Sequence, residues 1–387
     1  MIVTPANLLH YAQTPRQIEV LEAVEKHGSN TKAAKHLGIG RRTVDRIVSA
    51  VRQTAVRHGY SPEHDMTHTT PQGYAVRGVS TLYGPDGDVK AQWVKSGIDR
   101  AESLMAETIS ALSEEIKREK PTKPPARTIE DLANLYVITD YHIGAYAWAE
   151  ETGDDWDISI AEDTLVRWFS AAITQSPNAH TAILANLGDM VHFDGLEALT
   201  PTAKNVLDSD TRFQLIVRVI IRVMRRVIGM LLQKHEHVHI IMAEGNHDIA
   251  SSVWLREWFR ALYEEEPRIT VELSPDPYYC YEHGNTSLFF HHGHLRKPAQ
   301  IDTVFAAKFR DVFGRTKYSY AHMGHLHSVD VRETNLMLVE QHRTLAAPDA
   351  YASRHGWVSG RDAKVITYSK KHGEVARVVV SYGMIEA

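Results

Sequence analysis

The chain is 387 residues long, beyond the size at which one hydrophobic core usually stops growing, so two or more domains are expected. It is 43% hydrophobic and 24% charged with a net charge of −5, an ordinary composition for a soluble globular protein without global basicity. The single cysteine, Cys280, excludes an internal disulfide framework and a multi-cysteine zinc site, and it favours a reducing, cytoplasmic setting. No signal peptide is predicted, because the N-terminus lacks a basic start followed by an apolar core. No membrane span is predicted, because the most apolar run, 215–232, contains four arginines.

The first sixty residues are predicted to form three short helices. Thr14 followed by Pro15 is typical of a helix start, with a capping hydroxyl and a proline at the first helical position. A second helix begins at Asn30 and stops at Gly38. A third begins near Arg41 and carries apolar residues at helical spacing.

Residues 28–53 resemble the homeodomain-like helix-turn-helix of many bacterial regulators. The likeness rests on the Ala33-Ala34 pair, the Leu37-Gly38 turn and the start of the third helix. In such motifs this helix enters the major groove, so the resemblance implies DNA contacts by its first residues. These are Arg41, Arg42, Thr43 and Arg46.

The charge of this region also favours DNA. Residues 1–60 hold nine Lys or Arg against four Asp or Glu, so one basic module sits in an otherwise acidic chain. A plain three-helix bundle with a solvated basic face, or a module that docks a protein partner, are the alternatives.

The next segment is predicted to be a β-hairpin. Residues 73–96 form strand-like stretches around Pro85-Asp86-Gly87, as a wing beside the helix-turn-helix or as a separate clamp. A polar helix over 98–117 and a stiff linker rich in proline and charge, 118–127, follow. We therefore divide the chain into a helix-turn-helix domain, a hairpin segment, a helix with linker and a large C-terminal domain: 1–60, 61–96, 97–128 and 129–387.

Beyond the linker, strands alternate with helices. The predicted strands are 135–139, 181–186 and 238–243, and the predicted helices are 160–174, 208–234 and 251–264. Short strands then dominate: 269–273, 278–281, 287–291, 318–321 and several between 329 and 380. Alternating βα units that give way to β-rich sequence predict an α/β fold with a pair of sheets flanked by helices. The run of histidines over 235–239 is expected to decorate a surface strand.

Five of these strands end in polar side chains, and ligands in α/β folds bind at such strand ends. Asp140 and His142 are two apart and can face one centre, as can His325 and His327. Asp, His and Asn side chains without thiolate suit Mn²⁺, Fe or Zn²⁺ better than Ca²⁺ or Mg²⁺. The five strand ends are Asp140-Tyr141-His142, Gly188-Asp189, Gly245-Asn246-His247-Asp248, His291-His292-Gly293-His294 and Gly324-His325-Leu326-His327.

This ordered set resembles the calcineurin-like metallophosphoesterase superfamily, over roughly residues 130–345. The family pattern is Asp-x-His, Gly-Asp, Gly-Asn-His-Asp/Glu, His and Gly-His-x-His, and every element is present in this order. The resemblance implies a four-layer αββα sandwich and two divalent metal ions, Mn²⁺ first, with Fe or Zn as alternatives.

The resemblance also implies a role for each motif residue. Asp140, His142, Asp189 and His327 would hold the first metal. Asp189 would bridge to a second metal held by Asn246, His292 and His325, with His291 the alternative to His292. His247 would meet the substrate as general acid or hydrogen-bond donor, and Asp248 would orient it.

Several residues near the motifs have open roles. His192 and Asp194 could touch substrate or be structural, and His322 is expected to pack in the core. Four residues after the last motif could line a substrate groove: Arg343, Arg354, His355 and Arg361. A stripe of arginines on the 208–234 helix could contact nucleic acid or be a solvated face: Arg218, Arg222 and Arg225.

Fold and metals do not fix the substrate, because the superfamily includes nucleases, phosphoprotein phosphatases and nucleotide phosphodiesterases. A tethered helix-turn-helix would raise the effective concentration of DNA, and 139–144 and 320–327 resemble the double-strand-break-repair nuclease branch. We therefore expect a Mn²⁺-dependent DNA nuclease, with DNA as partner, no membrane and a protein partner left open. The alternatives are a nucleotide phosphodiesterase or phosphoprotein phosphatase with a docking module, and a DNA-binding regulator whose phosphoesterase domain is inactive.

Overall fold

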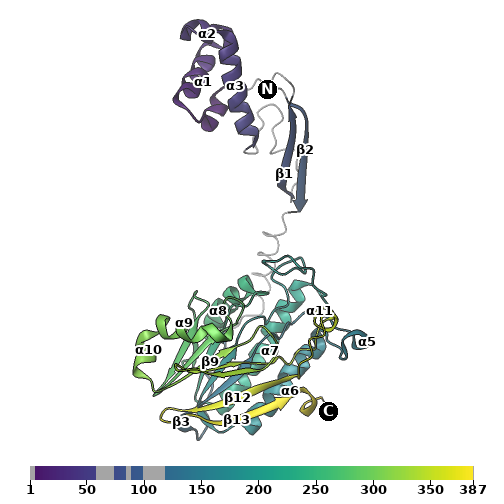
Figure 1. Ribbon diagram of the computed structural model, residues 1–387, viewed down its shortest axis with the longest axis vertical. Coiled ribbons are helices and arrows are strands. Elements are labelled where there is room, and N and C mark those ends of the chain that lie inside the picture. The colour runs from purple at the N-terminus through teal and green to yellow at the C-terminus, as the bar shows by residue number, and fades with distance from the viewer. Residues whose placement is uncertain (1–4, 58–73, 84–88, 99–117, 387) are drawn as a thin grey trace. The chain divides into compact units, whose positions relative to one another are not determined.

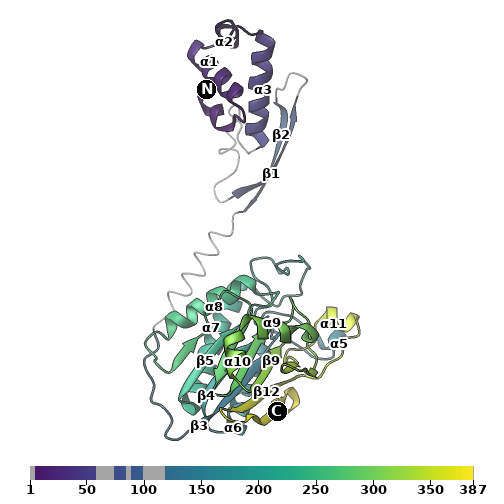
Figure 2. The same cartoon turned by 60° about the vertical axis from the view of Figure 1, so that its left-hand side comes forward.

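The computed structural model describes residues 5–57, 74–83, 89–98 and 118–386 (Figures 1 and 2). The chain divides into two compact units, Met1–Met105 and Ala106–Ala387, which we call the N-terminal and C-terminal units. Most of the predicted polar helix over 98–117, and the predicted hairpin turn at Pro85-Asp86-Gly87, lie outside the described residues.

The N-terminal unit contains the three predicted helices, which the structure confirms. They are α1 (Pro15–His27), α2 (Asn30–Leu37) and α3 (Arg41–Arg57), preceded by the 3-10 helix η1 (Pro5–Tyr11). Thr14 and Gln17 form a capping box at the start of α1: the Thr14 hydroxyl accepts the Gln17 N–H, and the Gln17 side chain accepts the Thr14 N–H. α1 and α2 thus each start at a capping hydroxyl, Thr14 and Ser29, and stop at a left-handed glycine, Gly28 and Gly38.

The three helices share one small core. Val20, Leu21, Ala33, Val44 and Val51 are buried in a single cluster. A strand pair follows in sequence, β1 (Tyr74–Tyr83) and β2 (Val89–Ile98), which pair antiparallel as the predicted hairpin requires.

The C-terminal unit contains two mixed sheets. The strand order of the first is β13-β12-β3-β4-β5-β6, and that of the second is β10-β11-β9-β8-β7. The first consists of β3 (Ile129–Ile138), β4 (Ala179–Asn186), β5 (His237–Met242), β6 (Ile269–Val271), β12 (Asp362–Ser369) and β13 (Gly373–Ser381). The second consists of β7 (Tyr279–His283), β8 (Thr286–His291), β9 (Tyr318–Met323), β10 (Asp330–Glu333) and β11 (Leu338–Gln341).

The sheets pack face to face because their inward side chains are apolar. Leu135 and Val137 of β3 share a buried cluster with Leu288 and Phe290 of β8. The residue between the first two, Tyr136, points the other way and its ring contacts Phe169 of α6, as the two-residue period of a strand requires. One core therefore lies between the sheets and another beneath the helices.

Helices cover the outer faces of both sheets (Figure 1). α6 (Ile158–Gln175) and α7 (Phe213–Lys234) cover the first sheet, and α9 (Ile301–Lys308) covers the second, where Phe305 stacks on Phe289. The predicted αββα sandwich is confirmed. The remaining helices are α5 (Ala149–Thr152), α8 (Ile249–Leu262), α10 (Arg310–Arg315) and α11 (Ala350–Arg354), with the 3-10 turns η3 (Pro298–Gln300) and η4 (Tyr382–Met384).

Three predictions of local structure were wrong. α7 begins at Phe213 and not at 208, because Asp210 instead caps another helix by accepting the N–H of Ile158. The helices α9 and α10 were missed, since eight and six residues carry too little periodicity to detect. His235 is fully buried and not on the surface, hydrogen-bonded to Tyr136 and to the Ala179 carbonyl.

No helix in the part of the chain that the structure describes is long and apolar enough to cross a membrane.

Arg268→Ala should destabilise the C-terminal unit by about 3 kcal/mol, since it leaves several buried carbonyls without a donor. The buried guanidinium donates to the carbonyls of Leu232, His235 and Glu236 and to the Thr122 backbone and hydroxyl. It therefore ties the start of β6 to the end of α7 and to the turn between α7 and β5. The unfolding temperature should fall by roughly 6–12 °C. The control Arg260→Ala, on an exposed i,i+3 pair, should cost less than about 0.5 kcal/mol. Equal shifts for both variants would contradict the assignment.

Candidate metal centre

The predicted ligands follow strands that run in the same direction, so they gather at one edge of the sandwich. β3, β4 and β5 pair parallel, as do β8 and β9. Backbone hydrogen bonds then tie the loops together: the N–H of Asp140 donates to Gly188 and that of His142 to Asp189. Across the sheets, the His325 N–H donates to Oδ2 of Asp140 at 2.8 Å.

Side chains at this edge form three overlapping clusters that could hold metal ions. Their nearest atoms include Nε2 of His327 and Oδ1 of Asp140, 3.3 Å apart, and Nε2 of His292 and Oδ2 of Asp189, 3.2 Å apart. Oδ1 of Asn246 lies 3.0 Å from the same His292 nitrogen. Two clusters contain carboxylates and share Asp140: Asp140, His142 and His327, and Asp140, Asp189, His292 and His325; a third, His142, His192 and His247, consists of histidines and shares His142. All seven predicted ligands are therefore brought together; which metal each would bind stays a prediction.

Backbone strain marks the same residues. Six non-glycine residues of the described chain have positive φ, and five of them are predicted ligands. Such a backbone costs about 1–3 kcal/mol per residue and persists where surrounding structure enforces it, most often at functional sites. The five are Asp140 (φ 50°), His142 (49°), Asp189 (56°), His325 (76°) and His327 (53°).

Two glycines make the close approach of these loops achievable. A Cβ on Gly245 would lie 2.0 Å from Oδ1 of Asp189. A Cβ on Gly324 would lie 1.8 Å from Oγ1 of Thr139. Any side chain at either position would force the ligand loops apart, so the motif glycines serve the donors beside them.

The centre fits cations electrostatically. Asp140 is fully buried, and its Oδ1 accepts no hydrogen bond from the described residues. Burial alone would raise its pKa, but His327 and His292 hold that pKa below the ordinary value. Burial would likewise lower the pKa of His292, yet Asp189 and Asp140 outweigh it and raise the pKa to about 9. Buried carboxylates that stabilise a proton here would stabilise a divalent metal ion, and the Asp, His and Asn donors suit Mn²⁺, Fe or Zn²⁺.

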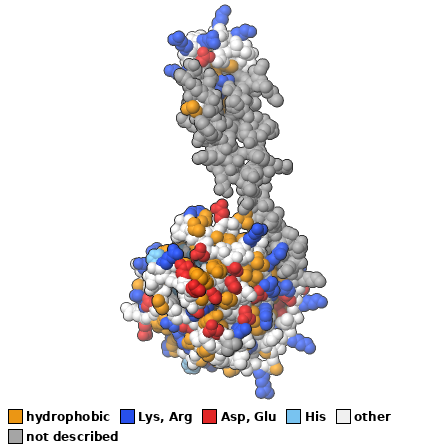
Figure 3. All heavy atoms as spheres, turned by 90° about the vertical axis from the view of Figure 1, so that its right-hand side faces the viewer, with side chains coloured by type: hydrophobic (Ala, Val, Ile, Leu, Met, Phe, Trp, Pro, Cys, Tyr) orange, Lys and Arg blue, Asp and Glu red, His pale blue; other side chains and the backbone are white. Residues whose placement is uncertain are grey.

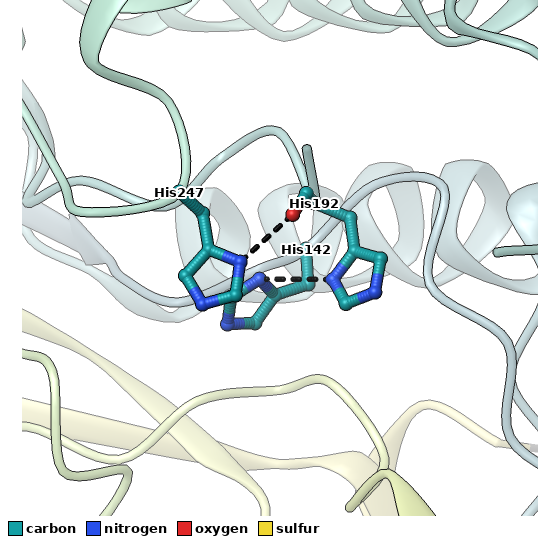
Figure 4. A group of neighbouring side chains, drawn as sticks. All are labelled: His142, His192 and His247. Atoms are coloured by element: carbon teal, nitrogen blue, oxygen red, sulfur yellow. Dashed lines mark hydrogen bonds between the residues drawn. The ribbon is translucent and has the colours of Figure 1, made fainter. Parts of the chain in front are cut away.

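His247 lies beside this centre in a fixed orientation (Figure 4). Its Nδ1 donates a hydrogen bond to the carbonyl oxygen of His192 at 2.8 Å, which leaves Nε2 for another partner. Its backbone N–H donates to Oδ1 of Asp189, and its ring meets that of His142 edge-on at 4.7 Å. His247 therefore touches two predicted ligands and is the predicted substrate-facing residue.

Among the three histidines of Figure 4, His142, His192 and His247, only His192 has a role that the sequence left open. Its Nδ1 lies 3.4 Å from Nδ1 of His142, and the side chain is buried. Burial lowers the pKa of His192 to about 3, and the nearby His247 adds to the shift. A neutral imidazole at this position can hold the His142 ring without adding charge.

Asp248 has a different contact set from the one expected. Its carboxylate accepts the backbone N–H groups of Gly245, Asp189, Met190 and Val191. The atom that orients the His247 ring is instead the carbonyl oxygen of His192. Asp248 thus fixes the Gly-Asp loop against the Gly-Asn-His-Asp loop.

The structure also places the other residues whose roles the sequence left open. His292 joins the donor cluster, whereas His291 stacks on Tyr278. Asp194 accepts the N–H groups of Ala250 and Ser251 at the start of α8, and His322 is buried against Tyr368.

The arginines predicted as groove candidates are mostly occupied. Arg343 pairs with Asp362, Arg354 with Glu151 and Arg361 with Asp154, while Arg222 and Arg225 pair with Glu162 and Glu119. The predicted DNA contacts belong to the N-terminal unit. There Arg41, Arg42 and Arg46 are exposed and Thr43 is half-buried, all on the first turns of α3.

No protein-family model matches the chain, and no curated protein sequence matches it. Solved structures with a similar fold include an archaeal phosphodiesterase, at 14% identity and a TM-score of 0.32 over 64% of this chain and 99% of that one. A predicted phosphoesterase from Streptococcus pneumoniae is 12% identical, with a TM-score of 0.27 over 65% of this chain and 99% of that one. A Vps29 from Entamoeba histolytica complexed with Zn²⁺ is 12% identical, with a TM-score of 0.27 over 64% of this chain and 99% of that one. All three likenesses are remote, so the function proposed below rests on this chain's own residues.

Mn²⁺ should bind the metal-free protein more tightly as pH rises from 6.5 to 8.5. His292 must lose its proton to become a ligand, and its pKa is about 9. Below that pKa, one competing proton changes the apparent affinity by roughly tenfold per pH unit. Calorimetric titration in buffers of different ionisation enthalpy measures the affinity and the proton released. An affinity that is constant over this range, with no proton release, would show that His292 is not a ligand.

Proposed function

We propose that the chain is a two-metal phosphoesterase that hydrolyses phosphodiester bonds, with DNA as its substrate. One observation carries the proposal: two overlapping clusters of carboxylate and imidazole donors share Asp140, and His247, the predicted substrate-facing residue, is held against them. A site that only stored a metal ion would not need a further histidine fixed in orientation beside two clusters.

The residues would divide the chemistry between them. Two bound divalent ions would polarise the phosphoryl oxygens and make water a better nucleophile at neutral pH. Asp140, His142, Asp189 and His327 would hold one ion. Asp189, Asn246, His292 and His325 would hold the other. His247, with Nδ1 bonded to the His192 carbonyl, would use Nε2 to donate a proton to the leaving oxygen.

The N-terminal unit supports DNA as the substrate. The first turn of α3, the predicted recognition helix, exposes Arg41 and Arg42 with an αL glycine, Gly38, before it. Exposed basic residues at the start of such a helix suit the phosphates and base edges of a duplex. A phosphoprotein or nucleotide substrate would leave this basic surface without a use, unless it docks a protein partner. A regulator with an inactive phosphoesterase domain fits less well, because the donor set is complete.

His247→Ala should keep both metal ions and lose about 100-fold or more in kcat, the usual contribution of a general acid. Asp189→Ala should lose metal as well as turnover, because that carboxylate contacts His292. The measurements are metal content by mass spectrometry and cleavage, with Mn²⁺, of linear duplex, nicked duplex, single-stranded DNA and bis(p-nitrophenyl) phosphate. His237→Ala, an exposed histidine on β5, is the matched control.

Each outcome decides between functions. Turnover of the small diester without cleavage of any DNA would overturn the nuclease. Metal loss in His247→Ala would overturn the role given to His247. A wild-type protein with metals bound but no turnover would favour the regulator.

The double variant Arg41→Ala, Arg42→Ala should bind duplex DNA more weakly and with a shallower salt dependence. Each lost phosphate contact should reduce the slope of log K against log salt by about 0.9. Fluorescence anisotropy between 50 and 300 mM salt, the range used for the test, measures both quantities. Lys120→Ala with Lys123→Ala makes the same charge change on exposed residues of the other unit. Equal effects of the two double variants would remove DNA recognition from α3.

A further inference from the structure

The basic residues of the C-terminal unit fall into two sets. Most arginines near the centre are paired with carboxylates, as Arg343, Arg354 and Arg361 are. Four exposed cations close to the predicted ligands in sequence or packing have no acidic partner among the described residues: Arg212, Arg218, Arg296 and Lys297. Charges left free beside a metal centre are available to a substrate.

Arg296 and Lys297 lie on the side of the second cluster. Their loop follows His292 and is fixed by Gly293, where a Cβ would be 3.0 Å from Cβ of His325. The ring of His294, the next residue, stacks parallel to that of His291 and lies 5.3 Å from that of His292. The loop re-enters the core at the buried Pro298. The two cations are thus presented from a short loop that is held at both ends.

Arg212 and Arg218 lie on the side of the first cluster. The loop that carries His142 packs on the start of α7: a Cβ on Gly144 would be 2.2 Å from Ile216, and the Asp210 N–H donates to the Gly144 carbonyl. Arg212 caps α7 and Arg218 lies on its second turn. Both line an open hollow of about 750 Å³ whose other lining residues are mostly polar, Ser209, Asp210, Thr211 and Gln214, with Leu215 beside them.

The side of the unit that bears α5 and α11 is different. Figure 3 faces this side and shows Asp and Glu side chains together with Lys and Arg side chains, among hydrophobic ones. Glu150 and Asp155 are exposed here, and Arg354 is already paired with Glu151. Exposed carboxylates such as these would not attract a polyanion.

We propose that Arg212 and Arg218 on one side, and Arg296 and Lys297 on the other, bind phosphates that flank the scissile bond. The substrate is then a polynucleotide strand that crosses the metal centre, and not a mononucleotide or a phosphoprotein. This inference rests on the proposed phosphodiesterase function and narrows its substrate class. Arginine suits the task because its planar fork binds a phosphate through two hydrogen bonds.

The test is the dependence of cleavage on strand length. The full-length protein with Mn²⁺ is given single-stranded oligonucleotides of two, four and eight nucleotides, which do not offer the duplex groove that a helix-turn-helix reads, and bis(p-nitrophenyl) phosphate. For the wild type, kcat/KM should rise with length. The quadruple variant Arg212→Ala, Arg218→Ala, Arg296→Ala, Lys297→Ala should lose about tenfold or more in kcat/KM on the octamer. The slope of log K for octamer binding against log salt should become shallower by about 0.7 per lost phosphate contact.

The variants are designed to separate binding from chemistry. The quadruple variant should keep the metal content and the unfolding temperature of the wild type, because none of the four residues is a predicted ligand. Its turnover of the small diester should stay within about twofold of the wild-type value. The two half variants, Arg212→Ala with Arg218→Ala and Arg296→Ala with Lys297→Ala, should each lose part of the length effect. Arg226→Ala with Arg310→Ala removes two charges, as each half variant does, at exposed arginines elsewhere in the unit that have no acidic partner among the described residues. This control should leave the length effect unchanged.

The proposal and the function that it rests on can fail separately. An octamer kcat/KM that is unchanged, or lowered no more than that of the small diester, would overturn the flanking sites and leave the phosphoesterase in place. An equal effect of the Arg226 and Arg310 control would overturn them too. If the wild type hydrolysed no phosphoester, the proposed function would fall. Anisotropy of a labelled octamer would then test the sites alone, and equal affinities of wild type and quadruple variant would overturn them.

Discussion

The burial of two carboxylates, Asp140 and Asp189, is the constraint on which the structure around the centre depends. Charges without solvent are costly unless they are paired and hydrogen-bonded, and neither side chain is more than 2% exposed. Imidazoles from three different loops surround them, and the hydrogen bond from the His325 N–H to Asp140 joins the two sheets. The left-handed backbone at five ligands and the close-fitting Gly245 and Gly324 follow from this demand, because only strained loops bring so many donors to two buried carboxylates.

A third buried carboxylate shows how the centre separates architecture from chemistry. Asp248 accepts four backbone N–H groups, so it joins the loop after β4 to the loop after β5 and fixes where Asp189 and Asn246 lie. His247 is thereby free of Asp248 and takes its orientation from the His192 carbonyl. In the sequence, neighbours in one tetrapeptide suggest a cooperating pair. In the folded chain, Asn246 contacts His292, the His247 ring lies against His142, and Asp248 holds the loops.

Much of this was predictable, because strand periodicity and the polar residues at strand ends are local signals. The sandwich, the three N-terminal helices and the residues of both donor clusters could be named before any coordinates. Contacts between residues far apart in sequence could not. The ion pair of Arg225 with Glu119 spans 106 positions, and that of Arg361 with Asp154 spans more than 200. The sequence therefore could not separate paired arginines from free ones, and it overlooked Arg212 and Arg296. His235 was misjudged for the same reason, since its partner Tyr136 is 99 residues away.

The pairing pattern also separates affinity from catalysis. Without metal ions, Asp140 and Asp189 are both strongly favoured as anions and hold a proton on His292, so the centre offers little net positive charge to a phosphodiester. Bound metal ions would supply positive charge at the scissile phosphate alone. The flanking cations act outside the clusters and keep their charge whether or not metal is bound, since arginine does not titrate in the physiological range. A strand could therefore be held by residues that take no part in the chemistry, while its reactivity depends on the buried carboxylates and on the ions that they hold.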